Sequence, residues 1–231
     1  MDARARTAST RKRKIFALAS AGIVLGIGAT ATLAAWNDNE WVVGGLDGGG
    51  DGIGTSRFNV QQNTLLPTAD VTDFVAAWDD HETQSDAGVL LFSLGALALT
   101  PGTTVYAPVA LQTEANSIAG TVTLQGAVKP TTTASPDLDA PLWDTLTYSV
   151  RSSTTAADCT DAASFAAFPA VTVADGTALG SALTAPEHAL AAAAGSTQYY
   201  CFAITLPDSP EAQETQGMSV APAWRFAAES A

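Results

Sequence analysis

Most of the chain after residue 56 consists of short runs in which apolar and polar residues alternate. Alternation with a period of two is the pattern of a β-strand that buries one face. Such runs lie at residues 57–62, 103–111, 118–128, 142–150, 198–206 and 218–228. Because turn residues separate them at regular spacing, the pattern predicts one all-β domain over residues 57–231, a two-sheet sandwich with a jelly-roll-like strand arrangement.

Two further features bear on where strands lie in these sheets. Residues 87–99 are almost continuously apolar, which is typical of a strand that is buried on both faces. Pro108 falls inside the run at residues 103–111, and a proline has no N–H group to donate to a neighbouring strand. We therefore expect this strand to lie at a sheet edge or to contain a bulge at Pro108.

A helical pattern is expected at one place only. Pro186 precedes the alanine-rich residues 187–194 and Gly195 follows them, as is typical of the start and end of a helix. The domain is therefore predicted to contain at most one short helix. Three of the five tryptophans lie in or beside strand patterns and are expected to be core residues rather than a ligand platform. These three are Trp78, Trp143 and Trp224.

The first 34 residues have the layout of a secretory signal peptide. Four consecutive basic residues at positions 11–14 precede an apolar stretch, and small residues follow it. Small side chains on both sides of Leu33 favour cleavage between Ala34 and Ala35, with a second option after Ala31. An uncleaved membrane anchor is the alternative, because the charge-free stretch is long enough to span a bilayer. Both readings place the rest of the chain outside the cytoplasmic membrane.

Residues 35–56 are predicted to form an N-terminal arm followed by a flexible tether. Seven glycines occur in residues 42–56, and each glycine disfavours a helix by about 1 kcal/mol relative to alanine. Asp47 and Asp51 lie among these glycines, but their spacing does not match a complete calcium loop. The composition therefore favours a tether over a metal site.

The charge of the chain changes sign at this boundary. Six of the ten Lys and Arg residues precede residue 15. After residue 34 there are four basic residues and twenty-two acidic ones, which gives a net charge of −18. A surface this acidic repels nucleic acid and anionic lipid headgroups, so we expect no nucleic-acid partner.

The two cysteines are expected to form one disulfide. Cys159 and Cys201 are the only cysteines, and a cysteine pair in an exported chain usually pairs. Two free thiols or half of a metal site are the alternatives. Cys201 falls in the run at residues 198–206 on the face opposite the predicted inward residues. Those inward residues are Tyr200, Phe202, Ile204 and Leu206.

No motif for catalysis or metal binding is complete. The chain has two histidines, His81 and His188, and lacks the helical zinc-protease motif, the serine nucleophile elbow and the phosphate-binding loop. Residues 79–82 place four potential ligands in a row, but neighbouring residues of a strand point to opposite faces and a turn would leave them solvated. We therefore predict a protein that is not an enzyme, with no catalytic residue, metal ligand or cofactor.

The junction between the signal segment and the arm resembles that of a known export class. Residues 32–40, Thr-Leu-Ala-Ala-Trp-Asn-Asp-Asn-Glu, are similar to the junction cleaved by the SipW-type signal peptidase of Gram-positive bacteria, whose substrates include TasA-type biofilm fibre subunits and camelysin-like proteins. Trp36, Asn37 and Asp38 match the aromatic residue and the Asn-Asp pair of this class. Looser similarity to its actinobacterial branch is found at residues 99–111, 142–150, 199–202 and 216–226.

The resemblance implies a secreted structural protein of the cell surface or extracellular matrix. In TasA-type fibres the freed N-terminal segment of one subunit adds as a strand to the next subunit. Carried over to this chain, the donor would be residues 35–43, with Trp36 and Trp41 as anchors. The expected partners are further copies of the chain or other surface proteins, besides the specialised signal peptidase during export. The alternative function is a monomeric secreted adhesin or carbohydrate-binding module.

Overall fold

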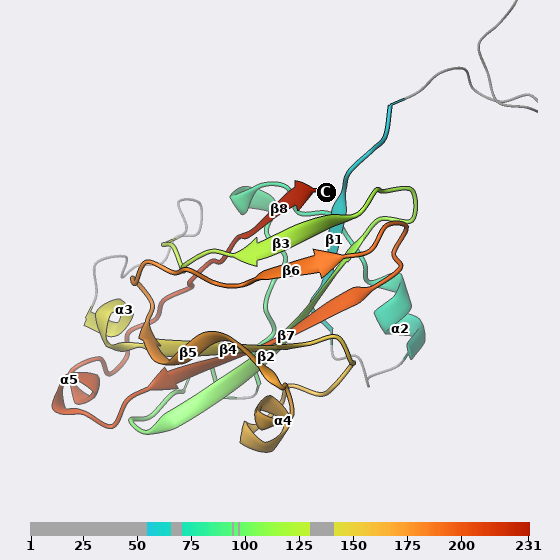
Figure 1. Ribbon diagram of the computed structural model, residues 1–231. Helices are drawn as coiled ribbons and strands as arrows, with labels where there is room; N and C mark the ends of the chain where they lie inside the picture. The colour runs from blue at the N-terminus through green and yellow to red at the C-terminus, as the bar shows by residue number, and fades with distance from the viewer. Residues whose placement is uncertain (1–54, 66–70, 94, 97, 130–140) are drawn as a thin grey trace, which may run out of the picture. The chain divides into compact units, whose positions relative to one another are not determined.

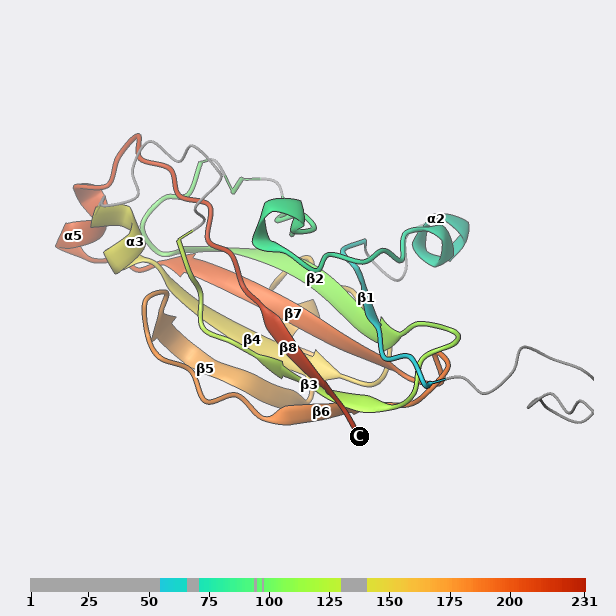
Figure 2. The same ribbon diagram turned by 90° about the horizontal axis from the view of Figure 1, so that it is seen from above.

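The computed structural model of the chain describes residues 55–65, 71–93, 95–96, 98–129 and 141–231 (Figure 1). Within these residues, eight strands form two antiparallel sheets that lie one above the other (Figures 1 and 2). The five-stranded sheet contains, in spatial order, β1 (Val60–Asn63), β2 (Thr103–Thr113), β7 (Thr197–Leu206), β4 (Thr147–Ser153) and β5 (Ala170–Ala178). The three-stranded sheet contains β6 (Glu187–Leu190), β3 (Gly120–Leu124) and β8 (Phe226–Ser230). The predicted two-sheet sandwich is confirmed.

The prediction of at most one short helix is wrong, because the described residues contain four short α-helices and one 3₁₀ turn, all in connections between strands. These are α2 (Val71–Ala76), η1 (Gln84–Asp86), α3 (Pro141–Thr145), α4 (Ala162–Ala166) and α5 (Pro210–Gln213). The Asp161 side chain accepts a hydrogen bond from the Ser164 N–H and caps α4, and the Ser209 hydroxyl caps α5. Within the described ranges, no helix combines the length and apolar character that a membrane span requires.

The helix predicted at residues 187–194 is wrong. Residues Glu187–Leu190 form strand β6, which pairs with β3, and Leu190 is 1% exposed. The following alanines form a turn in which Ala193 and Ala194 have φ values of 54° and 55°. Alanine has the highest helix propensity, but the preference amounts to less than about 1 kcal/mol per residue, so burial of Leu190 and pairing with β3 override it here.

Two other strand predictions also need correction. Residues 142–145 belong to helix α3, and the strand begins only at Thr147. Leu142 and Trp143 are nevertheless buried, because the helix turns its apolar residues toward the core. The described part of residues 87–99 forms no strand: it consists of a turn, a bend and residues without regular structure, and it has no ladder to a neighbour. An apolar run alone does not distinguish a buried strand from an irregular segment that covers the core.

Pro108 occupies the kind of position that its chemistry requires. It lies in β2, but β1 pairs only with residues 110–113 of that strand. The Tyr106 carbonyl faces away from β7 and accepts a hydrogen bond of 2.8 Å from the Ser93 N–H. Every second residue of a strand directs its backbone groups to the same side, so the backbone of Pro108 also faces away from β7. No described strand lies on that side of Pro108, which is the local edge that the sequence predicts.

The main core fills the space between the sheets. Strand β7 supplies Tyr200, Phe202, Ile204 and Leu206 to it, as predicted. From the three-stranded sheet, Val122 and Leu124 are fully buried, and the Phe226 ring lies 4.8 Å from that of Tyr200. The predicted core role of the tryptophans holds for Trp143, which is 6% exposed, and for Trp224, which packs against this core. Trp78 is half-buried against Phe74.

A second, smaller core lies on the other face of the five-stranded sheet, beside α4. The alternation of β7 directs Cys201 and Ala203 to this side, where they meet Phe165 and Phe168. Cys201 and Cys159 form the predicted disulfide, with a Cα–Cα distance of 5.5 Å. The disulfide therefore ties the segment that precedes α4 to a central strand.

We expect that replacing Tyr200 with phenylalanine stabilises the protein. The Tyr200 side chain is 0% exposed and its hydroxyl has no hydrogen-bond partner in the described part of the chain. A buried hydroxyl without a partner costs roughly 1–3 kcal/mol, so Y200F should raise the free energy of unfolding by about 1 kcal/mol. Thermal unfolding at pH 7 measures this. Y199F, on the opposite face of the strand, is the control, and equal melting temperatures for Y200F and the unsubstituted protein would contradict the prediction.

The same substitution should change the response to alkali. Burial raises the pKa of Tyr200, so the phenol stays protonated in the folded state while it ionises near pH 10 in the unfolded state. The unfolded state then binds fewer protons, and stability falls as the pH rises above about 10. The stability difference between Y200F and the unsubstituted protein should therefore grow above that pH.

Candidate functional site

Among the described residues, no strand pairs with the outer edge of β8. On its inner side, the Gln125 N–H donates to the Arg225 carbonyl at 2.8 Å, and the Ala231 N–H donates to the Ala119 carbonyl at 3.0 Å. Backbone groups of a strand alternate in direction, so Phe226, Ala228 and Ser230 turn their N–H and C=O groups away from β3. No strand among the described residues pairs with these groups.

The strand order shows what this edge lacks. The order β2-β7-β4-β5 opposite β6-β3-β8 is that of a jelly roll, in which the first strand pairs with the last. Here β1 pairs with β2 at the edge of the other sheet instead. In Figure 2, β7 and β2 of the lower layer are visible beyond the outer edge of β8. One strand position beside β8 is therefore not filled by any described strand.

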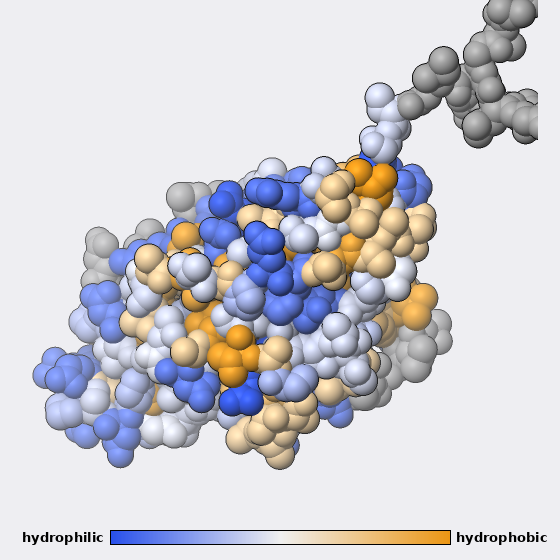
Figure 3. All heavy atoms as spheres, viewed as in Figure 1, coloured by the Kyte–Doolittle hydropathy of each residue, from blue (hydrophilic) through white to orange (hydrophobic). Residues whose placement is uncertain are grey.

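The surface of β8 suits the approach of another chain. Ala228, Glu229 and Ser230 are exposed, and Phe226 and Ala227 are partly so. Small side chains at positions 227, 228 and 230 leave the backbone accessible. An exposed row of N–H and C=O groups is a template for strand addition. On the face seen in Figure 3, hydrophobic residues are scattered among hydrophilic ones and form no single broad patch.

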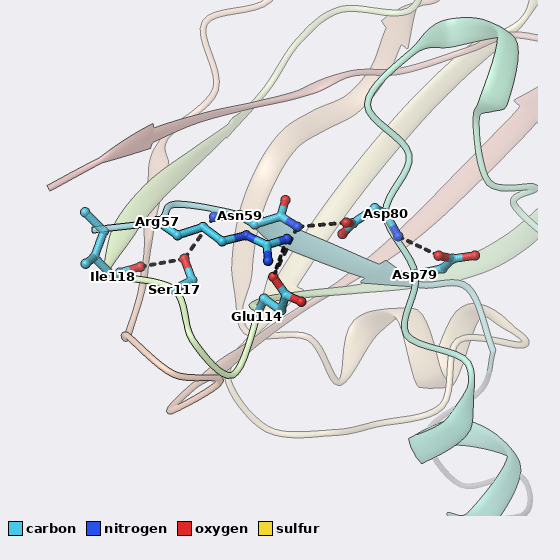
Figure 4. A network of polar contacts seen from close by, with 7 residues as sticks. All are labelled: Arg57, Asn59, Asp79, Asp80, Glu114, Ser117 and Ile118. Carbon is cyan, nitrogen blue, oxygen red and sulfur yellow. Dashed lines mark hydrogen bonds and ion pairs between the residues drawn. The ribbon is translucent and has the colours of Figure 1, made fainter. Parts of the chain in front are cut away.

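The segment that enters β1 is held to the domain by a polar network (Figure 4). The Arg57 guanidinium lies 2.8 Å from the Glu114 carboxylate. The Asn59 side-chain amide donates to Asp80 at 2.7 Å and makes a longer contact of 3.5 Å with Glu114. Asn59 is 8% exposed, so its amide links two carboxylates in a nearly buried position. These bonds fix the side chains of Arg57 and Asn59, between the predicted tether and β1.

Backbone hydrogen bonds hold the same segment to the start of β3. The Ile118 N–H donates to the Arg57 carbonyl at 2.9 Å, and the Asn59 N–H donates to the Ser117 hydroxyl oxygen at 2.9 Å. The Ser117 hydroxyl in turn donates to the Ile118 carbonyl at 3.0 Å. The exposed ion pair of Arg57 contributes little by itself, because surface salt bridges are worth about 0–1 kcal/mol. The backbone bonds are therefore the stronger part of this attachment.

Residues 79–82, which the sequence singled out as potential ligands, serve structural roles instead. The Asp79 N–H and carbonyl exchange hydrogen bonds with Gln62 of β1, at 3.1 and 2.9 Å. Asp80 accepts from Asn59, and the His81 ring nitrogen lies 3.6 Å from Asp86. Over the described ranges, no group of three or more His, Cys, Asp or Glu side chains is arranged to hold a metal ion.

A shallow hollow of 470 Å³ lies between α3 and α5. Asp144, Glu211 and Glu214 line it, together with prolines and hydroxyl-bearing residues. Hydrogen bonds from its own backbone N–H and from Ser209 lower the pKa of Glu211. The lining residues include carboxylates and hydroxyls but no histidine, cysteine or basic group.

The structure tests only part of the predicted site. The Cys159–Cys201 disulfide is confirmed. The predicted cleavage point between Ala34 and Ala35, and the arm residues Trp36, Asn37, Asp38 and Trp41, lie outside the described residues. Sequence reasoning missed the open edge of β8. The signal for it is weak: a short final strand of small residues, whose pairing depends on strands far away in the sequence.

Comparisons with known proteins do not assign the chain to a family. Neither a protein-family profile, nor a characterised protein, nor a solved structure matches the chain.

Proposed function

We propose that the chain is an exported structural protein of the cell surface or extracellular matrix that assembles with copies of itself by strand addition. The arm of one copy (residues 35–43) would pair with the outer edge of β8 of the next copy. The observation that carries this proposal is that no described strand pairs with the outer edge of β8 or fills the strand position beside it. Addition of an extended segment to such an edge forms a ladder of main-chain hydrogen bonds.

The sequence supplies a suitable donor for this edge. The arm is apolar at both ends, with Trp36 near its start and Trp41, Val42 and Val43 at its end. The glycine-rich tether that follows, about 13 residues between the arm and Arg57, can span up to roughly 45 Å when extended. That reach is sufficient for the arm of one copy to meet a neighbouring copy.

Export is supported by the disulfide and by the resemblance at the signal junction. A disulfide persists in an oxidising compartment outside the cytoplasm. Copies with a net charge near −18 repel each other, and salt screens this repulsion beyond about 10 Å at 0.1 M. Assembly should therefore be measured at moderate ionic strength, and the protein used should be the chain from Ala35 to Ala231.

We expect that Ala228→Pro prevents self-assembly. The Ala228 N–H points outward, so proline there removes an unpaired donor and blocks the approach of a strand without breaking a bond to β3. A228S keeps the N–H group and is the matched control. In sedimentation velocity, the unsubstituted chain and A228S should form polymers whose size grows with concentration, whereas A228P should sediment as a monomer.

Two results of this experiment would contradict the proposal. If A228P forms the same polymers as the unsubstituted chain, the edge of β8 is not the site of assembly. If the unsubstituted chain remains a monomer at every concentration, self-assembly is wrong, and the alternative of a monomeric secreted binding module is preferred.

A further inference from the structure

Residues 88–92, which we name the wall segment, close one side of the main core without forming a strand. Leu90 and Phe92 pack against the core cluster that contains Val105, Val109 and Leu111 of β2. The residues between and before them point outward, and Val89 is 68% and Leu91 55% exposed. The side chains therefore alternate as in a strand that buries one face.

The backbone of the wall segment has no hydrogen-bond partner in the described part of the chain. Residues 88–92 have no regular secondary structure. Pairing begins at the next residue, where the Ser93 N–H donates to the Tyr106 carbonyl at 2.8 Å and the Tyr106 N–H donates to the Ser93 hydroxyl oxygen at 3.2 Å. Within the described part of the chain, two partly buried side chains and the Ser93 bonds are therefore the main attachments of this segment, so its local opening costs little free energy.

The wall segment lies against the strands that the unfilled position beside β8 would cover. At one end, a Cβ on Gly88 would meet the Gln62 side chain of β1, and at the other end Ser93 bonds to β2. In Figure 2, β2 lies beyond the outer edge of β8, so no strand of the three-stranded sheet covers it. The inward residues of β2 that belong to the main core, Val105, Val109 and Leu111, are nevertheless only 2–6% exposed. Leu90 and Phe92 contribute to that cover.

We propose that the wall segment is a latch on self-assembly. A strand that pairs with β8 needs the space over β2 that Leu90 and Phe92 fill, so the wall segment leaves this space when the arm of another copy binds. The apolar side chains of the arm then take the place of Leu90 and Phe92 on the core. This inference rests on the proposed function, because it requires strand addition at β8.

The test uses a single thiol placed in the latch. The described residues contain no free cysteine, and both cysteines of the chain are in the disulfide, so L90C in the chain from Ala35 to Ala231 carries the only reactive thiol. Its rate of alkylation by a maleimide is measured in monomers and in polymers. We expect alkylation about tenfold or more faster in polymers, because the site opens. L91C, which is exposed before assembly, is the control and should change little.

A second measurement needs no substitution in the latch. Hydrogen exchange of the Ser93 amide should lose protection in polymers, while the Ala228 and Ser230 amides of β8 gain it. If β8 gains protection but Ser93 stays protected and L90C alkylation is unchanged or slower, the latch is wrong and strand addition stands. If no polymers form, or if the β8 amides stay unprotected, the proposed function is wrong and the latch is wrong with it.

Discussion

Replacing Cys159 and Cys201 together with alanine should lower the free energy of unfolding by about 4 kcal/mol. The disulfide closes a loop with a sequence separation of 42, and breaking it gives the unfolded chain the freedom that this loop removes. Both cysteines are also buried, at 1% and 0% exposure, in the small core with Phe165 and Phe168. In this core the disulfide is the covalent link between the segment before α4 and strand β7.

Urea unfolding of the double variant and of the unsubstituted protein measures this difference. The control is the unsubstituted protein unfolded in the presence of a reducing agent, which loses the cross-link but keeps both sulfur atoms. The two should have similar stabilities if the cross-link dominates. A loss of less than about 1 kcal/mol in the double variant would show that the loop is already constrained in the unfolded state.

The second large effect is expected from Gly120→Ala. Gly120 faces inward in β3, and a Cβ placed there would lie 2.5 Å from the Phe58 ring and would also meet the carbonyl oxygen of Glu229 in β8. Neither neighbour can move away freely, because Glu229 belongs to the ladder with β3 and Phe58 belongs to the segment held by Arg57 and Asn59. Overpacking of this kind destabilises by about 1–3 kcal/mol.

Gly180→Ala is the matched control for this prediction. A Cβ at Gly180 would have its nearest neighbour, the Trp143 ring nitrogen, at 3.4 Å, which is ordinary contact. There, alanine should be neutral or slightly stabilising, because it restricts the unfolded chain. The melting temperature should therefore fall in G120A and stay constant or rise in G180A. Equal melting temperatures for the two variants would mean that β3 and β8 separate easily at Gly120.

Alternation in the sequence predicted the fold class and part of the core. Every second residue of β7 from Tyr200 to Leu206 is strongly apolar, and the structure places these residues inward and Cys201 on the other face. The chemistry of proline likewise predicted a local edge at Pro108. These predictions succeed because they depend on the residue itself and its immediate neighbours.

The failures have a common physical cause. The alanines after Leu190 and the apolar residues at 142–145 and 88–92 fit more than one local structure, and packing against distant parts of the chain decides between them. Leu190 is buried by pairing with β3, and Leu142 is buried from a helix. Which strand β1 joins, and hence which edge stays open, is also a long-range property. The resemblance at the signal junction implied a donor arm, but no sequence pattern indicated the edge that would accept it.

Hydrogen exchange of β8 in the assembled protein tests the central claim most directly. In monomers of the chain from Ala35 to Ala231, the outward amides of Ala228 and Ser230 should exchange freely, while the Ala227 amide, on the β3 side, should be protected. In polymers, Ala228 and Ser230 should become protected as well, and a chain that lacks residues 35–43 should show neither polymers nor this protection. Polymers in which Ala228 and Ser230 still exchange freely would contradict strand addition at β8.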